Sequence, residues 1–181
     1  MHILKYLTPF VLVVSILFPG CKKDKGPDVR DVVTGTYTGS QTYTLQWSKI
    51  SSKFADSTVT YSVALTVAID NSTSDGLAIT ELGLGGYPNF PYKATAVIAT
   101  NDGAMFNIPQ QTVTTTYFSS ISNTTITGSP CFLFNNASYD GHYTDLDGLL
   151  SLVYGGTTPV FSSVLGQKNV PFVIINTCTK Q

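Results

Sequence analysis

The clearest pattern in the chain is a strict alternation of apolar and small polar positions between residues 59 and 69. Its odd-numbered positions are Val59, Tyr61, Val63, Leu65, Val67 and Ile69, and its even-numbered ones are Thr60, Ser62, Ala64, Thr66 and Ala68. Successive side chains of a β-strand point to opposite faces, so this period of two predicts a strand with one apolar face. A run of about eleven residues exceeds the usual five or six and favours a barrel or a large antiparallel sheet.

The segment from Val33 to Trp47 repeats the alternation. Aromatic or apolar residues share one face with Gln41, and threonines dominate the other face. Gly35 and Gly39 fall on the aromatic face, where a missing side chain lets a strand bend or lets a neighbour pack closely. We therefore expect a strongly curved first strand.

Shorter strands are predicted along the rest of the chain. They cover residues 77–84, 92–100, 104–108, 111–117, 124–128, 138–144, 148–154, 159–164 and 172–177. Turn-forming pairs such as Asp147-Gly148 and Gly155-Gly156 separate them, and a short helix is expected only near 48–56 or 162–167. The fold class is thus all-β, either a barrel or a β-sandwich.

The first 31 residues have a different composition from the rest. Lys5 precedes an apolar run from Tyr6 to Phe18, which is too short to span a bilayer as a helix and is typical of a signal peptide. Residues 17–21, which end in Gly20-Cys21, resemble the lipobox of bacterial lipoproteins, with Phe18 in place of the favoured leucine. The resemblance implies a signal peptide over 1–20 and lipid on Cys21. The alternative is a free Cys21 thiol after an ordinary secretory signal.

Residues 21–31 are charged and contain Gly26 and Pro27, so we expect a polar tether there and a single domain over 32–181. Beyond the tether, Gly35-Thr36-Tyr37 is similar to the Gly-x-Trp step that begins the first strand of lipocalins, with tyrosine replacing tryptophan. Together with the lipobox, this resembles the small lipocalin-like (calycin) lipoproteins of Gram-negative bacteria. The resemblance implies an antiparallel up-and-down barrel, with a β-sandwich as the alternative, on a lipid anchor in the outer membrane.

Charge and composition exclude several function classes. From Val32 onward five lysines oppose eight acidic residues, without the basic cluster that nucleic acid requires. His142 is the only histidine after the signal peptide, and no Gly-x-Ser-x-Gly motif accompanies it, so we predict no enzyme, no metal site and no cofactor. His142 with Asp140 would be the best catalytic candidates if that prediction failed.

Cys131 and Cys178 form an even pair in a chain expected outside the cytoplasm. They are either joined by a disulfide, which would stabilise the fold by about 3 to 4 kcal/mol, or are two separate buried thiols.

The richest loop runs from Gly83 to Tyr92 and carries three rings. Its candidate ligand-binding residues are Tyr87, Asn89, Phe90 and Tyr92, because exposed rings beside an amide can stack on a sugar or an apolar ligand. The alternative is that the rings fill an open end of the barrel. The expected function is accordingly a lipid-anchored, non-enzymatic envelope protein that binds a small apolar ligand or a glycan, or else a structural or protein-interaction module of a surface complex.

Overall fold

The computed structural model describes residues 26–83, 89–119, 124–134 and 140–181, and almost all of them lie in antiparallel strands. One short helix and one 3-10 turn accompany ten strands in that part of the chain. In order they are α2 (Val29–Val33), β1 (Gly35–Leu45), η1 (Trp47–Lys49), β2 (Ser57–Asp70), β3 (Gly76–Gly83), β4 (Phe90–Ala99), β5 (Gly103–Asn107), β6 (Gln111–Ser119), β7 (Thr124–Phe134), β8 (Gly141–Thr144), β9 (Leu149–Ser162) and β10 (Gly166–Lys180). The predicted all-β class is confirmed.

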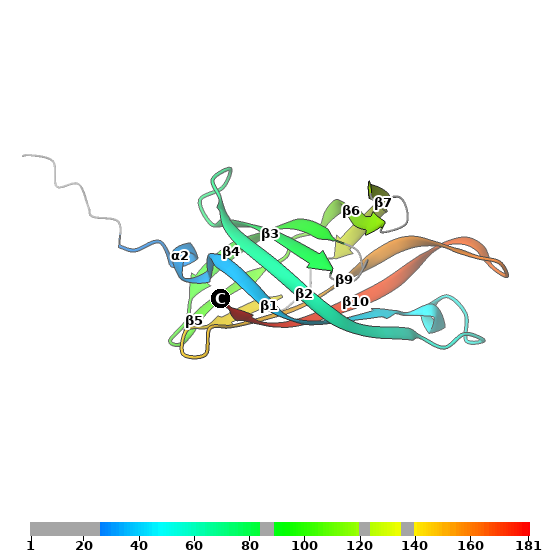
Figure 1. The fold of residues 1–181 in the computed structure, drawn as a ribbon, viewed down its shortest axis with the longest axis horizontal. Helices are drawn as coiled ribbons and strands as arrows, with labels where there is room; N and C mark the ends of the chain where they lie inside the picture. The colour runs from blue at the N-terminus through cyan, green and yellow to red at the C-terminus, as the bar shows by residue number, and fades with distance from the viewer. Residues whose placement is uncertain (1–25, 84–88, 120–123, 135–139) are drawn as a thin grey trace, which may run out of the picture.

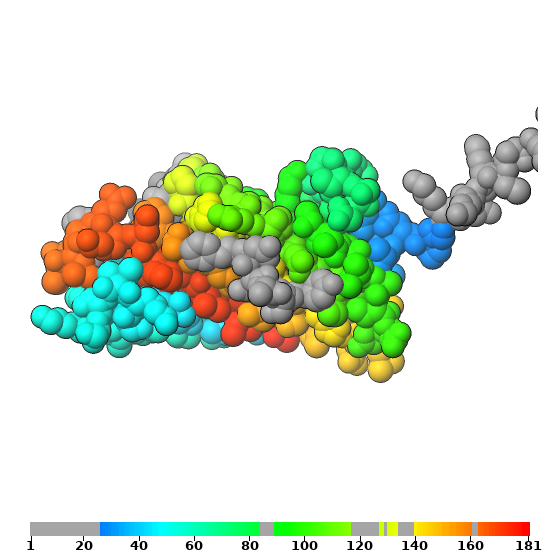
Figure 2. All heavy atoms as spheres, turned by 180° about the vertical axis from the view of Figure 1, so that it is seen from behind, coloured from blue at the N-terminus to red at the C-terminus, as the bar shows by residue number. Residues whose placement is uncertain are grey.

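Eight of the strands close into a ring of hydrogen bonds. The order runs β10-β1-β2-β3-β4-β5-β8-β9, and β9 pairs with β10 from Leu149 to Ser162 to complete it. Figure 1 shows this barrel with the long β1–β2 and β9–β10 hairpins extending at the end away from α2. The same two hairpins project together in the view from behind (Figure 2). Such a ring of hydrogen bonds is typical of a barrel-like all-β fold.

The β6–β7 hairpin departs from the expected up-and-down order. In the sequence it lies between β5 and β8, which pair directly with each other in the sheet. β8 pairs with β9 as far as Leu152, and β7 pairs with the next part of β9, Gly155–Thr157. On its other side a single bridge joins Thr116 to Asn89, the residue before β4. The wall between β4 and β9 is therefore built by β5 and β8 near one end and by β6 and β7 near the other (Figure 1).

The predicted alternation of β1 and β2 is confirmed. Tyr37 and Gln41 of β1, like Val63 and Leu65 of β2, are buried inside the barrel. The threonines between them point outward, where Thr42 and Thr60 share a hydrogen bond of 3.0 Å. Gly39 faces inward, and a Cβ there would lie 2.1 Å from the backbone oxygen of Thr177, so β10 packs against β1 as closely as expected.

The turn predicted at Gly155-Gly156 does not exist. Both glycines lie inside β9, which joins the two strands expected over 148–154 and 159–164. A Cβ at Gly156 would lie 2.3 Å from the backbone oxygen of Phe132 and 2.7 Å from the Phe172 ring. Gly156 allows β7 to approach β9 closely. Glycine inside a strand often marks such a close approach of another backbone.

Helix α2 packs on one end of the barrel, against β4 and β5. Asp28 caps α2 by accepting a hydrogen bond from the backbone of Arg30, and Val33 is fully buried in the core. The Arg30 guanidinium pairs with Asp28 and donates to the backbone oxygen of Thr73 at 3.2 Å, in the β2–β3 turn. Figure 1 shows α2 at this end of the barrel, where the Arg30 guanidinium bonds to the turn and Val33 packs inward. No described helix is long and apolar enough to span a membrane.

Arg30 supplies the side-chain bonds between α2 and the β2–β3 turn, so we expect Arg30→Ala to loosen α2 without unfolding the barrel. Hydrogen exchange should become faster at the α2 amides and stay unchanged in β9 and β10. Lys53→Ala, in the exposed β1–β2 connection, is the matched control and should leave α2 protected. Equal protection of α2 in both variants would contradict this role of Arg30.

Candidate functional site

The cysteines occupy distant positions on either side of β9. Cys178 of β10 lies opposite Leu150, whereas Cys131 of β7 precedes Phe132, which lies opposite Thr157. Leu150 and Thr157 are seven residues apart on β9, which places the two cysteines roughly 20 Å from each other along the strand direction. A disulfide requires Cα atoms within about 7 Å. No disulfide joins Cys131 and Cys178. They are two separate buried thiols, the second of the two alternatives, and burial raises the pKa of Cys178 to about 12.

The aromatic residues proposed as a ligand loop belong to the core. Phe90 is 1% exposed and packs near Tyr43 and Phe172, with ring centroids 6.4 Å and 6.2 Å away. Tyr92 is 4% exposed and points inward, and the Asn89 side chain accepts from the backbone of Gly83. Tyr87 lies outside the described residues. Neither Phe90 nor Tyr92 is an exposed ring, and the alternative in which the rings fill the barrel holds for both.

A buried carboxyl group lies at the centre of the barrel. Glu81 of β3 is 0% exposed, and each of its oxygens accepts two hydrogen bonds. Oε1 accepts from Tyr92 Oη at 2.5 Å and from Asn176 Nδ2 at 2.6 Å. Oε2 accepts from Gln41 Nε2 at 2.5 Å and from Tyr154 Oη at 2.9 Å. Four donors saturate the carboxylate, which has about four acceptor positions.

Six strands contribute one residue each to this group, which we call the Glu81 cluster. Its members are Gln41 (β1), Tyr61 (β2), Glu81 (β3), Tyr92 (β4), Tyr154 (β9) and Asn176 (β10). Tyr61 completes it by donating to Gln41 Oε1. Gln41 lies directly between its β2 and β10 neighbours in the ladder, which brings three of the six residues into one row.

Burial dominates the electrostatics of the cluster. Loss of water around the carboxylate raises the pKa of Glu81 from its ordinary 4.5 to about 7, while the bonds from Tyr92, Tyr154, Gln41 and Asn176 oppose that rise. The pKa values of Tyr92 and Tyr154 are raised well above 10 by burial and by the nearby carboxylate, so both phenols stay protonated.

This raised pKa predicts that the protein is more stable in mild acid than in mild alkali. Between pH 4.5 and about 7 the folded state holds a proton that the unfolded state has released. The stabilisation is therefore complete below pH 4.5 and is lost as the pH rises through about 7, amounting to about 3 kcal/mol in the free energy of unfolding. Urea unfolding measured from pH 4.5 to 8.5 checks the sign. Subtracting the free energy of unfolding of Glu81→Gln from that of the unaltered protein at each pH isolates the contribution of Glu81. A contribution that stays constant or increases with pH would contradict the prediction.

The two residues considered for catalysis, His142 and Asp140, contact different partners. His142 on β8 lies 3.8 Å from Asp102 and is about half exposed. Asp140 is 2% exposed, and its Oδ2 accepts from the backbone nitrogen of Ile108 at 2.6 Å, which fixes the chain before β8. Within the described residues no three His, Cys, Asp or Glu side chains come close enough to bind a metal ion.

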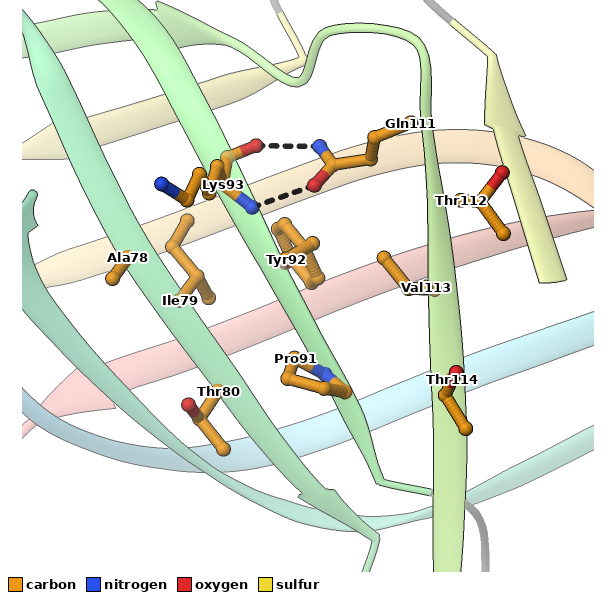
Figure 3. A pocket seen from close by; sticks show the side chains of 10 residues that line it. All are labelled: Ala78, Ile79, Thr80, Pro91, Tyr92, Lys93, Gln111, Thr112, Val113 and Thr114. Atoms are coloured by element: carbon orange, nitrogen blue, oxygen red, sulfur yellow. Dashed lines mark hydrogen bonds between the residues drawn. The ribbon is translucent and has the colours of Figure 1, made fainter. Parts of the chain in front are cut away.

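The outer wall has an open groove of about 520 Å³ where β3 and β4 face β6. β4 and β6 share no continuous ladder there. The Gln111 side-chain amide instead bonds to the backbone of Lys93, donating to its oxygen at 2.7 Å and accepting from its nitrogen at 2.9 Å (Figure 3). Apolar groups, among them Pro91, lie beside the hydroxyls of three threonines. Those threonines are Thr80, Thr112 and Thr114.

The sequence analysis predicted neither the Glu81 cluster nor the groove, although the cluster has a signal in the sequence. In the strand predicted over 77–84, Glu81 shares a face with Leu77 and Ile79, just as Gln41 shares the aromatic face of the first strand. The sole glutamate of the chain on an apolar face is the mark of a buried carboxyl group. The groove has no such mark, because it depends on where the β6–β7 hairpin lies.

Comparisons of the chain with protein families, with curated proteins and with solved structures find no match to any of them.

Proposed function

We propose that this protein is a non-enzymatic, lipid-anchored protein of a bacterial cell envelope, expected in the outer membrane, that binds a glycan in the groove between β3, β4 and β6. The anchor is the lipid predicted on Cys21. The groove is the observation that carries the binding role, because it is the recess of the outer wall that combines hydroxyls, an amide and an apolar floor.

The lining of the groove suits a sugar better than an apolar molecule. Sugars present hydroxyls at their edges and C–H groups on their faces, so they need hydrogen-bonding groups beside a small apolar surface. Thr80 and Thr112 are exposed hydroxyls, and the Pro91 ring provides an apolar surface between their strands. Lys93 adds an ammonium group, held 2.7 Å from Asp70 Oδ2.

The barrel interior offers less support for a ligand. The described interior side chains form one continuous apolar cluster, and the Glu81 carboxylate already accepts from four protein donors. An apolar ligand inside the barrel would have to displace these contacts.

The test is titration of the full-length protein in detergent with soluble peptidoglycan and lipopolysaccharide oligosaccharides, followed by calorimetry. The double variant Thr80→Val/Thr112→Val removes two hydroxyls without changing their shape. Loss of two hydrogen bonds should weaken binding about tenfold or more. Thr177→Val, an exposed position of β10, is the matched control and should bind like the unaltered protein.

Equal affinity in the double variant and the control would reject the groove as the binding site. Absence of binding to every oligosaccharide would reject the glycan and favour the second function, a protein-interaction module.

One observation favours that second function. Ile175 and Val153 are direct neighbours on the outer face of β10 and β9, and they are 45% and 44% exposed. Such an apolar pair on a wall otherwise rich in threonine suits a protein contact. The test is copurification of partner proteins from membranes with the unaltered protein and with Ile175→Thr. A partner protein that copurifies equally with both would argue against this surface as the contact.

A further inference from the structure

Two hairpins extend beyond the closed part of the barrel, at the end away from α2 (Figure 1). β10 pairs with β1 only from Phe172 onward, whereas its pairing with β9 begins at Gly166. The stretch from Gly166 to Phe172 corresponds to roughly 20 Å along the strand. The β1–β2 connection projects at the same end. We call residues 46–56 and 163–168 the hairpin tips.

The β1–β2 tip is held in shape by its own contacts. Trp47 begins the 3-10 turn η1, and the centroid of its ring lies 6.4 Å from that of Phe54. The Ser48 backbone nitrogen donates to Asp56 Oδ1 at 2.9 Å, which closes the connection. The rings of Trp47 and Phe54 are therefore held in place at the surface, where both remain partly exposed.

The hairpin tips combine apolar and basic side chains. Val164 is 74% exposed, and Ile50 and Leu165 are partly exposed. The tips also carry three of the five lysines that follow Val32, against one acidic residue, Asp56. The three lysines are all exposed, and they are Lys49, Lys53 and Lys168.

The opposite end of the barrel has the reverse charge. Its turns, which lie beside α2, carry four exposed acidic residues, namely Asp75, Asp102, Asp145 and Asp147. Arg30 and Lys180 at this end are partly buried and bond to backbone oxygens of the protein. An anionic surface therefore attracts the hairpin tips and repels the acidic turns, which orients the barrel with its tips toward that surface.

An anionic lipid bilayer fits this combination better than a protein does. Lysine is depleted at the centre of protein interfaces. Tryptophan rings and lysine side chains are instead favoured at the membrane surface, where the ring lies at the headgroup level and the lysine stem packs on apolar groups while its ammonium group stays in water. Lysines near an anionic leaflet are also attracted by its negative surface potential.

We propose that the hairpin tips dock on the surface of an anionic lipid bilayer, with Trp47 and Val164 in the headgroup region and the three lysines beside the lipid phosphates. The chain enters the barrel at α2, at the opposite end, so the docked bilayer faces the one that would hold a lipid on Cys21. This contact is independent of the glycan groove, because the two share no residue.

The test uses the full-length protein inserted in neutral phosphatidylcholine vesicles. Heavy vesicles of phosphatidylglycerol and phosphatidylcholine in equal parts are added and sedimented, and the protein in the pellet is measured. The protein should sediment with these vesicles and stay behind with heavy vesicles of phosphatidylcholine alone. The fluorescence of Trp47, the only tryptophan of the chain, should move to shorter wavelength as its ring leaves water.

Two sets of variants locate the contact. Replacing the three tip lysines by glutamine should weaken binding about fiftyfold or more, since each lysine near an anionic surface contributes about fivefold. Adding Asp102→Asn, Asp145→Asn and Asp147→Asn to that variant restores the net charge of the chain at the opposite end, and it should not restore binding. Val164→Ser should weaken binding about threefold or more, because an apolar side chain no longer leaves water.

Three results would overturn the proposal. The first is absence of the protein from the pellet of anionic vesicles. The second is sedimentation without a shift of the Trp47 fluorescence, which would indicate a purely ionic contact of the kind that an acidic protein or polysaccharide makes. The third is recovery of binding when the three aspartates are neutralised, which would show that net charge governs binding and that the hairpin tips do not.

Discussion

Replacing Glu81 by alanine is expected to lower the free energy of unfolding by about 4 kcal/mol or more, one of the two largest effects that we foresee in the chain. The substitution removes the acceptor of four buried donors, from Gln41, Tyr92, Tyr154 and Asn176. A buried donor left unpaired costs about 1–3 kcal/mol, and the lost side chain also leaves a cavity. Urea unfolding near pH 8, where the Glu81 carboxyl is ionised, provides the measurement.

Glu81→Gln is the matched control for this loss. Glutamine has the same shape and keeps one acceptor oxygen, and the tyrosine hydroxyls can accept from its new amide. We expect it to cost less than half as much as alanine. Equal costs for both variants, or a cost below about 1 kcal/mol for alanine, would show that the cluster does not hold the six strands together.

Replacing Gly39 by valine is expected to cost about 3 kcal/mol or more, for a steric reason. A Cβ at this position would lie 2.1 Å from the backbone oxygen of Thr177 and 2.6 Å from the Cα of Cys178. Both atoms belong to the backbone of β10, so no side chain can turn aside and the two strands must separate.

Thr38→Val tests the same strand on its outer face. Thr38 is exposed next to Gly39, so this change should alter the free energy of unfolding by less than about 0.5 kcal/mol. Thermal unfolding of the two variants side by side gives the comparison. A Gly39→Val protein as stable as Thr38→Val would mean that β1 and β10 do not pack as closely as described.

Local patterns predicted the strands well because each strand carries its own signal. The alternation of Tyr61, Val63, Leu65 and Val67 reflects one buried and one exposed face, and it needs no knowledge of the neighbouring strands. The turn at Asp147-Gly148 was likewise predicted from residues that favour it, and Gly148 has a positive φ.

Contacts between distant segments could not be predicted in this way. Gly155-Gly156 looks like a turn in the sequence, and only the approach of Phe132 and Phe172 explains why it is a strand. The Glu81 cluster joins residues as far apart in the chain as Gln41 and Asn176, and their meeting depends on closure of the barrel. The bonds from Arg30 to the β2–β3 turn join residues forty or more positions apart, so they also have no local signal.

The proposed lipid anchor on Cys21 is tested most directly by metabolic labelling of the full-length protein with a fatty-acid probe. The unaltered protein and the control Cys131→Ala should both incorporate the probe, since Cys131 is buried in the barrel. Cys21→Ser should lose the label and leave the membrane fraction. Undiminished labelling of Cys21→Ser would contradict the lipid anchor.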